Sequence, residues 1–326
     1  MRRLTATIER WPLAQPFVIS RGAKTEAVVV VVEIVDGAFR GRGEATPYGR
    51  YGETAEGVVA QVHELAGSIE AGLDRGDLQI SLPAGAARNA LDCALWDLAA
   101  KQSGARVWEL LGLNRLDPVK TCFTLSLDRP EVMAEAARAQ SRRPMLKLKI
   151  GGPQDIDAVA AVREAAPRTR LIVDANEALR FDDLVRLAPE FERLGVQLIE
   201  QPLPAGADGA LEGYVCPVPL CADESLHTRA EIAEVAGRYA FVNVKLDKAG
   251  GLTEAFALAQ EARAFGMGLM VGCMVATSLA MAPAMIIAQD AAFTDLDGPL
   301  LLARDREPGL VFEGSSIQPP SPALWG

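Results

Sequence analysis

Charged residues interrupt short apolar runs at several places in the second half of the chain. In 145–150, MLKLKI, two lysines lie two residues apart, and in 241–246, FVNVKL, one lysine follows the apolar residues. Three further runs end in an acid. Strands that are buried on both faces are nearly all apolar, so these charges require a chemical explanation. The positions are Lys147, Lys149, Asp174, Glu200, Asp223 and Lys245.

Three carboxylates at three successive run ends indicate a metal site. If the runs are parallel strands, Asp174, Glu200 and Asp223 meet at one rim, where they would repel and shift one another's pKa. Mg²⁺ would resolve that conflict, since it prefers oxygen ligands and leaves positions open for water or substrate. Zinc fits less well, because no Cys or His is among the three. We therefore expect one Mg²⁺ per active site, with His63 and His227 as bystanders.

The lysines suit proton transfer on two faces of a substrate. Lys147 and Lys149 are two residues apart and so lie on one face of a strand. In an eight-stranded barrel, the strands of Lys149 and Lys245 would be four apart and would face each other across the mouth. A substrate carboxylate on the cation would hold its α-carbon between two amines, one removing a proton and the other returning it.

The environment of these lysines would also prepare them as bases. Partial burial and neighbouring cations would lower the lysine pKa and leave a neutral amine. The cation would stabilise the enediolate that forms when the α-hydrogen leaves. The alternative is that Lys147, Lys149 and Lys245 only neutralise the acids in salt bridges.

Short apolar runs alternate with amphipathic helical stretches from Val119 onward, which is typical of βα units and a parallel sheet. Eight such units predict a closed barrel with its active site at the C-terminal strand ends. An open doubly wound sheet is less well supported, because no G-x-G-x-x-G follows any run. The expected strands are 119–125, 145–150, 170–174, 196–200, 218–223, 241–246, 268–273 and 292–297.

The first part of the chain has the pattern of a small α+β domain. Residues 26–35 and 38–45 predict a hairpin, since Asp36-Gly37 supplies the positive φ of a tight turn. Two helices are expected after it, near 54–72 and 84–111. The expected division is 1–115 for this domain, 116–299 for the barrel, and 300–326 for a segment rich in Gly, Pro and Ser that returns to the first domain.

Composition points to a small-molecule partner. With 33 Lys and Arg against 43 Asp and Glu, the formal net charge of −10 offers no electrostatic basis for binding nucleic acid or an anionic membrane. The five cysteines include no C-x-x-C pair and are expected to be reduced, as in the cytoplasm. Residues 264–289 are uncharged, but their glycines and Pro283 favour a buried strand and helix over a membrane span.

Together these motifs resemble the enolase superfamily, in its muconate cycloisomerase-like branch, and within it the L-Ala-D/L-Glu (dipeptide) epimerases. The matching segments are Lys147-Leu-Lys149, Val-Asp174-Ala-Asn, Ile-Glu200-Gln-Pro, Ala-Asp223-Glu-Ser and Val-Asn-Val-Lys245-Leu-Asp-Lys-Ala-Gly-Gly. Enolase-superfamily sites use a Lys or His base with Mg²⁺. The resemblance implies a (β/α)7β TIM-like barrel with an N-terminal α+β capping domain. It implies acid/base roles for Lys149 and Lys245, metal binding by the three acids, and neutralisation of the substrate carboxylate by Lys147.

Weaker features of the resemblance concern the substrate. Asp295 and Asp297, in TDLDGP, match an acidic pair that receives the free ammonium group in dipeptide epimerases. Arg21, in FVISRG, resembles a capping-loop arginine that holds the distal carboxylate of a glutamyl residue. Thr124 and Thr277 match further positions near the substrate. The alternatives are an ordinary turn around the two aspartates and a solvated loop charge at Arg21.

The resemblance therefore predicts a cytoplasmic isomerase of the L-Ala-D/L-Glu epimerase type, which inverts the Glu α-carbon by two-base 1,1-proton transfer in murein peptide recycling. Its partner would be a dipeptide, without nucleic acid or membrane, and the sequence leaves a homo-oligomer open. A muconate cycloisomerase or an o-succinylbenzoate synthase needs no ammonium receptor, so the acidic pair argues against these rivals. A metal-binding barrel without catalysis is the alternative from a different class.

Overall fold

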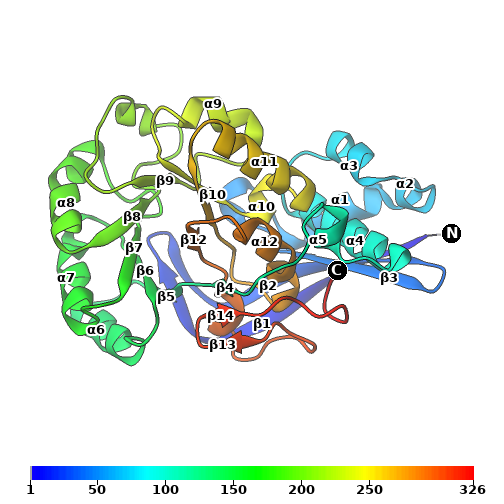
Figure 1. Ribbon diagram of the computed structural model, residues 1–326, viewed down its shortest axis with the longest axis horizontal. Helices are drawn as coiled ribbons and strands as arrows, with labels where there is room; N and C mark the ends of the chain where they lie inside the picture. Colours follow the sequence, from blue (N-terminus) through cyan, green and yellow to red (C-terminus); the bar gives the residue numbers. More distant parts are fainter. Residues whose placement is uncertain (1) are drawn as a thin grey trace.

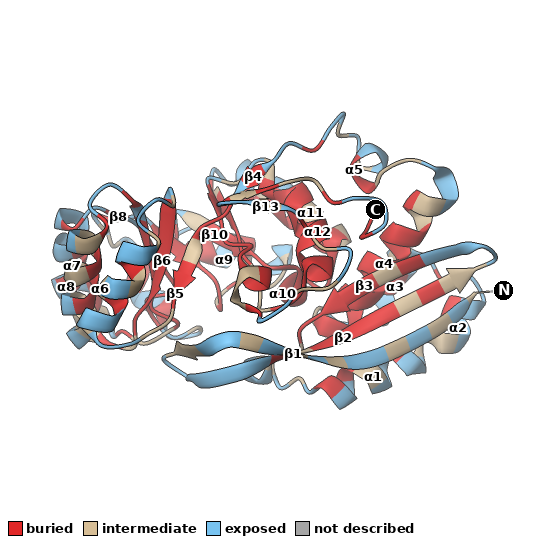
Figure 2. Ribbon diagram, turned by 90° about the horizontal axis from the view of Figure 1, so that it is seen from below, coloured by how far each residue is buried: buried red, intermediate tan, exposed pale blue. Residues whose placement is uncertain are grey.

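A computed structural model describes residues 2–326. Figure 1 shows a curled sheet wrapped by helices, beside a twisted antiparallel sheet that carries its own helices. In Figure 2 the long β1–β2 hairpin runs along the second part, and its exposed tip extends beneath the first. The two parts are held together by strands and loops from both ends of the chain.

The curled sheet has eight strands in the order β5 to β12, and all neighbouring strands are parallel. The amide of Cys122, just before β5, donates to the carbonyl of Thr294 in β12 at 2.8 Å, so the first strand meets the last. The predicted TIM-like barrel is confirmed. The strands are β5 (Phe123–Leu125), β6 (Met145–Lys149), β7 (Arg170–Asp174), β8 (Val196–Glu200), β9 (Leu220–Ala222), β10 (Phe241–Val244), β11 (Gly268–Val271) and β12 (Phe293–Thr294).

An apolar layer fills the lower part of the barrel. Seven buried side chains form one cluster there, and Phe241 packs against them. Each comes from a different strand or its immediate start, as the layered filling of a closed barrel requires. The seven are Cys122, Met145, Ile172, Leu198, Cys221, Met270 and Phe293.

Amphipathic helices cover the outside of the barrel. In α8 the buried residues Leu184, Leu187, Ala188 and Phe191 follow the 3.6-residue period, so one face packs on the sheet and the charged face meets solvent. Among residues 2–326 no helix is long and apolar enough to cross a membrane. The helices are α6 (Pro130–Ala139), α7 (Ile156–Ala165), α8 (Phe181–Arg193), α9 (Ile232–Val235), α10 (Leu246–Ala249), α11 (Leu252–Ala264) and α12 (Ser278–Ala288), with 3-10 turns η2 (Pro153–Asp155), η3 (Asp208–Leu211), η4 (Arg229–Glu231) and η5 (Gly298–Leu301).

The N-terminal part is a three-stranded antiparallel sheet, ordered β1-β2-β3, with helices on one face. The predicted hairpin is confirmed, with Gly37 at φ 60° in its turn. At Gly43 a Cβ would lie 2.1 Å from the carbonyl oxygen of Ala90, so α4 packs this closely on β3 only because the residue is glycine. The elements are β1 (Arg3–Ile19), β2 (Gly22–Asp36), β3 (Phe39–Ala45), η1 (Gly49–Tyr51), α1 (Ala55–Glu64), α2 (Ala66–Glu70), α3 (Arg75–Ser81), α4 (Ala86–Ser103) and α5 (Val107–Leu110).

Several predicted strands differ from the observed ones. The run 119–125 is divided: β4 (Val119–Lys120) pairs with β14 (Ser316–Ile317), which also pairs with β13 (Phe312–Glu313), and only β5 joins the barrel. The runs ending at 223, 246, 273 and 297 leave the sheet one to three residues before those ends. Strand β1 was not predicted; its Pro12 and Pro16 are tolerated because it is an edge strand.

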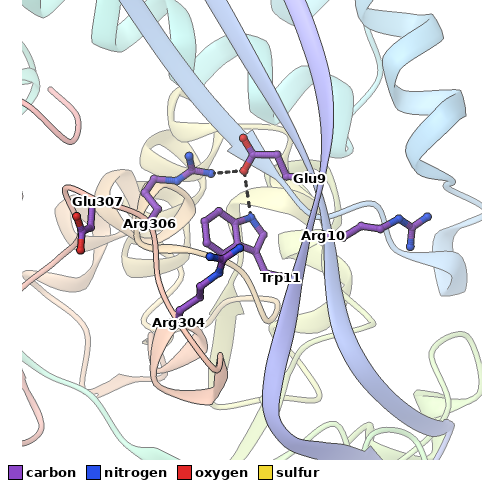
Figure 3. Close-up of a pocket in the computed structure, with 6 residues that line it drawn as sticks. All are labelled: Glu9, Arg10, Trp11, Arg304, Arg306 and Glu307. Atoms are coloured by element: carbon purple, nitrogen blue, oxygen red, sulfur yellow. Dashed lines mark hydrogen bonds and ion pairs between the residues drawn. The ribbon is translucent and has the colours of Figure 1, made fainter.

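The C-terminal segment returns to the N-terminal part. Trp325 is fully buried, and its ring nitrogen donates to the carbonyl of Cys93 on α4 at 3.1 Å. Arg306 binds Glu9 on β1 at 2.8 Å and Glu44 on β3 at 2.7 Å. Figure 3 shows Arg306 pointing to Glu9, whose carboxylate also accepts from the ring nitrogen of Trp11. The division at residues 115 and 299 stays a prediction.

Glu44 is fully buried, so the guanidinium of Arg306 compensates its charge. We expect Arg306→Ala to lower the free energy of unfolding by about 3–5 kcal/mol, because it leaves a buried carboxylate unpaired. The measurement is urea unfolding followed by circular dichroism. Arg263→Ala, which breaks an exposed pair with Asp290, should cost at most about 1 kcal/mol. Equal losses in the two variants would contradict this account. Adding Glu44→Gln to Arg306→Ala should recover part of the lost unfolding free energy, because it removes the uncompensated charge.

Candidate active site

A polar layer lies directly above the apolar layer of the barrel. Inward side chains recur every second residue along a strand, so the residue two positions beyond each apolar member also points inward. At β11 that residue is Gly272, where a Cβ would lie 2.6 Å from Asn243 and 3.0 Å from Lys245. The missing side chain therefore makes room for its neighbours. The other members, all at most 5 % exposed, are Thr124, Lys147, Asp174, Glu200, Asp223, Asn243 and Asp295.

Lys147 lies at the centre of this layer. Its ammonium group is 3.0 Å from Asp174 and 2.7 Å from both Glu200 and Asp295, with the side chain only 1 % exposed. Burial alone lowers a lysine pKa, but the three carboxylates outweigh it and raise the pKa of Lys147 well above its usual value. Lys147 is therefore a permanent positive charge in the barrel.

The other two lysines flank the row of acids. Lys149 donates to Asp174 at 2.5 Å on one side, and Lys245 donates to Asp223 at 2.7 Å on the other. Since β6 and β10 are four positions apart in the closed ring, the two amines come from opposite walls. The lysines therefore form the salt bridges to the acids that the sequence left open as an alternative role. Lys149 and Lys245 also lie on opposite walls, as predicted.

The acids around Lys245 act against the lowering of its pKa that was expected from burial and neighbouring cations. Burial lowers its pKa, but Asp223 and Glu200 raise it well above the usual value. The sequence argument counted neighbouring cations and omitted the acids, which lie closer. Lys248, which the sequence did not single out, adds a second ammonium at 2.7 Å from Asp223.

The acids differ in how many lysine ammonium groups lie within 3.0 Å: two at Asp174 and at Asp223, but one at Glu200. Burial and the charge of Asp174 raise the pKa of Glu200 to about 7. Burial also acts on Asp174 and Asp223, but Lys149 and Lys147 lower the pKa of the first, and Lys245 and Lys248 lower that of the second. The protonation states of these three neighbouring carboxyl groups therefore depend on the lysine ammonium groups beside them.

The donor set fits a hard divalent cation. Among residues 2–326 no three His, Cys, Asp or Glu side chains enclose a metal site as they stand, because lysine ammonium groups lie between the carboxylates. One buried oxygen each of Glu200 and Asp223 makes no hydrogen bond and has only a lysine charge beside it. Oxygen atoms of this kind are the ligands that Mg²⁺ prefers. With Asp174 they could hold it.

A cavity of about 640 Å³ opens above the polar layer. Its floor includes Thr124, Lys147, Lys149, Asp223 and Lys245, and its roof comes from the hairpin tip and the loop around η1. The cavity is therefore built from both parts of the chain.

Asp295 and Asp297 line one side of the cavity, next to β5. Asp295 is bound by Lys147 at 2.7 Å and by the Thr124 hydroxyl at 3.4 Å, and Asp297 accepts from the Thr124 amide at 2.6 Å. Burial and the charge of Asp295 raise the pKa of Asp297 to about 7, whereas Lys147 keeps that of Asp295 low against its burial. An acidic pair of this kind can receive a cationic group.

Arg21 lies at the opposite, cap end of the cavity, and its guanidinium is engaged by protein groups. Its nitrogens donate to the carbonyl of Asn176, to Glu177, to Glu224 at 2.7 Å and to the hydroxyl of Tyr48.

Lys24 lines the same end of the cavity and was missed from the sequence. In the described chain its ammonium group has no hydrogen bond or ion pair, and it lies 5.2 Å from the centre of the Tyr48 ring. Burial and the neighbouring Arg21 charge lower its pKa. A cation that lines the cavity beside a like charge can receive an anion. Its position three residues after Arg21 was the available signal.

The structure does not bring Thr277 to the cavity. It begins α12, is fully buried, and bonds to Glu44 and Arg306 at the junction of the two parts. The expectation that it lies near the substrate is corrected, because its hydroxyl is committed to that junction.

Asn243 could have been found from the sequence. It lies two residues before Lys245, so the spacing that joins Lys147 to Lys149 also places it inward, where it donates to Glu200 at 2.8 Å. Asn176 and Glu224 follow two of the predicted acids and also line the cavity. Their contacts with Arg21 depend on how the cap docks, which no local pattern reveals.

Fold and site define a two-part barrel protein with paired lysines and acids at the strand ends. The model of the mandelate racemase / muconate lactonizing enzyme N-terminal domain matches residues 1–112, and that of the enolase C-terminal domain-like family matches residues 131–322. The chain belongs to the enolase superfamily, in its mandelate racemase / muconate lactonizing enzyme group.

Three relatives within this superfamily are similar to the chain over nearly its whole length. The L-Ala-D/L-Glu epimerase of Escherichia coli is 48 % identical over 96 % of this chain and 98 % of its own length. A crystal structure from Agrobacterium tumefaciens, of an enolase family member with homology to dipeptide epimerases, holds sodium and L-Ala-L-Glu; it has a TM-score of 0.98 and 50 % identity over all of both chains. A dipeptide epimerase from Methylococcus capsulatus, complexed with Mg and L-Arg-D-Lys, has a TM-score of 0.89 and 31 % identity over 98 % of this chain and 96 % of its own.

A bound cation should partly replace the ammonium group of Lys147 in compensating the charge of the buried carboxylates. We expect Lys147→Met to cost about 3–5 kcal/mol of unfolding free energy in EDTA, because it leaves several buried carboxylates with less compensation. Saturating Mg²⁺ should recover part of that loss by supplying the missing charge. Urea unfolding with and without Mg²⁺ measures both effects. The exposed Lys120→Met is the control, and a Lys147→Met variant as stable as this control in EDTA would contradict the role of the charge.

Proposed function

We propose that the protein is a magnesium-dependent dipeptide epimerase that acts on L-Ala-D/L-Glu. The observation that carries the proposal is the placement of Lys149 and Lys245 on opposite barrel walls, with a row of buried acids between them. The named relatives support an epimerase of this class. The Mg in the Methylococcus complex supports the cofactor.

The chemistry follows from the charges of the site. Mg²⁺, held by Asp174, Glu200 and Asp223, would bind the substrate carboxylate and make its α-hydrogen more acidic. Binding of these acids to a cation would remove the interactions that keep Lys245 protonated, so the amine becomes available as a base. Lys149 and Lys245 then act on opposite faces of the α-carbon, one taking a proton and the other returning it.

The two ends of the cavity would orient the dipeptide. The free ammonium group lies against Asp295 and Asp297, with Thr124 holding the pair, and Lys147 neutralises the substrate carboxylate. The distal carboxylate of Glu reaches the cap end, where Arg21 is already engaged and Lys24 is not. We assign this carboxylate to both cations, with Lys24 providing the unengaged donor.

The cellular role is part of the proposal. A substrate of this kind fits recycling of murein peptides in the cytoplasm. All five cysteines are free, and three of them are buried; reduced cysteines are the usual state in the cytoplasm. A homo-oligomer stays a prediction.

Solvent exchange tests the reaction. In D₂O with Mg²⁺, the protein should exchange and invert the Glu α-centre of L-Ala-L-Glu, followed by NMR and chiral chromatography. Lys149→Ala and Lys245→Ala should each lower epimerisation by about 10²–10⁴-fold, the range for loss of a general acid or base. Each variant should keep exchange only for the stereoisomer whose α-hydrogen faces the remaining lysine.

Lys120→Ala, an exposed lysine outside the cavity, is the control and should match the unmodified protein. No deuterium uptake with any dipeptide would overturn the proposed function. Equal loss of exchange for both stereoisomers in each variant would overturn the two-base assignment alone.

Lys24 gives a test of the substrate class. Lys24→Met should lower kcat/KM for L-Ala-L-Glu by about 10–100-fold, because a hydrogen bond to a charged group contributes about 1.5–3 kcal/mol. The same change should leave L-Ala-L-Leu nearly unaffected, since that substrate has no distal carboxylate. Lys24→Arg should retain most of the Glu preference. An unchanged ratio between the two substrates in Lys24→Met would exclude Lys24 as the receptor.

A further inference from the structure

The turn that follows β7 has an unusual backbone. Asn176 and Glu177 have φ values of 42° and 71°, a left-handed conformation that residues other than glycine rarely adopt. The amide of Asn176 donates to Asp174 at 2.9 Å, and that of Glu177 to the carbonyl of Gln201 at 2.9 Å. Strain of this kind persists where surrounding contacts fix it and is concentrated at functional sites. Here it directs one carboxylate toward the cap.

The Glu177 carboxylate receives hydrogen bonds from both cap loops. Arg50 donates through two nitrogens, each at 2.9 Å, and Arg21 donates through one at 3.2 Å. The amide of Ala205 adds a bond at 2.8 Å from the barrel side. The Glu177 side chain is only 10 % exposed. A two-pronged pair between arginine and a nearly buried carboxylate is stronger and more directional than an ordinary surface salt bridge.

The two arginines come from the two loops that roof the cavity. Arg21 lies at the tip of the β1–β2 hairpin, and Arg50 lies in η1. The loops also bind each other, because Arg21 donates to the hydroxyl of Tyr48 at 2.8 Å. Glu177 thus binds an arginine from each of the two loops, and Glu224 binds Arg21 as well.

The cap is attached to the barrel elsewhere as well. Asp247, after β10, accepts bonds from the amide of Thr46 and the side chain of Asn89, both at 2.9 Å. Arg88 on α4 donates to carbonyls of Ala249 and Gly250. These contacts do not involve Glu177. Loss of Glu177 should therefore release Arg50 and leave the cap docked. It should also weaken the hold on the hairpin tip, where Arg21 keeps its bonds to Glu224 and to the carbonyl of Asn176.

We propose that Glu177 is a positioning residue that latches both cap loops closed over the substrate cavity through Arg21 and Arg50. It does not contact the reacting atoms. Substrate entry and product release require the two arginines to part from it, as in lids that gate other active sites. The kinetic consequence rests on the proposed epimerase function, whereas the structural consequence does not.

Trypsin tests the latch without any assumption about activity, because it cleaves after Arg21, Lys24 and Arg50 in the loops themselves. With the full chain, Glu177→Ala should be cut at these three bonds about tenfold faster than the unmodified protein, as expected when a local opening becomes easier. Arg50→Ala, which removes one of the three sites, should be cut faster after Arg21 and Lys24. The thermal midpoints of both variants should stay within about 2 °C of the unmodified value. Glu190→Ala, which breaks an exposed pair with Arg193, is the matched control. Cleavage at the unmodified rate, or a large fall in midpoint, would overturn the latch.

Kinetics with L-Ala-L-Glu supplies the second test. Glu177→Ala should raise KM about tenfold and change kcat less than about threefold, since the chemical groups are intact and closure is weakened. The double variant with Arg50→Ala should be no worse than Glu177→Ala alone, because both hydrogen bonds of Arg50 end on Glu177. A fall in kcat at unchanged KM, or additive losses, would overturn the proposal. Faster tryptic cleavage in a protein with no epimerase activity would refute only the proposed function and leave the latch in place.

Discussion

The structure depends on the burial of several carboxylates at the mouth of one barrel. Asp174, Glu200 and Asp223 carry charge in a place from which water is largely excluded, and such burial is costly without compensation. Lys147 lies among the acids and the other lysines flank them, while the apolar layer beneath closes the barrel floor. In the proposed reaction the same charges govern reactivity, because a cation bound by the acids would weaken the interactions that keep Lys245 protonated.

The two parts of the chain have different tasks. In the proposed reaction the barrel supplies the groups that act on the α-carbon, and their positions are fixed by strand register and by the absence of a side chain at Gly272. In the proposed function the cap supplies Arg21 and Lys24 from a hairpin whose tip is exposed. Selectivity therefore lies on the more adaptable part, and relatives that share the barrel groups can differ in the dipeptide they bind.

The errors of the sequence analysis have a common physical source. Predicted strands were too long where polar residues leave the sheet to line the cavity, as at Asp295 and Asp297. The pKa of Lys245 was expected to fall, although the nearest charges turned out to be acids. Thr277 was expected beside the substrate, but packing of α12 against β3 commits it to Glu44. Each error concerns distances between segments that lie far apart in the chain.

The sequence by itself determined the barrel, the order of its strands, and the group of lysines and acids at their ends, because a two-residue period and βα alternation are local properties. It also determined the hairpin at Asp36-Gly37, since turn chemistry is local too. Only the tertiary structure decided which cations at the cap end are engaged and which is free. It also decided that Glu177 meets both cap loops, because such contacts depend on how two separately folded layers dock.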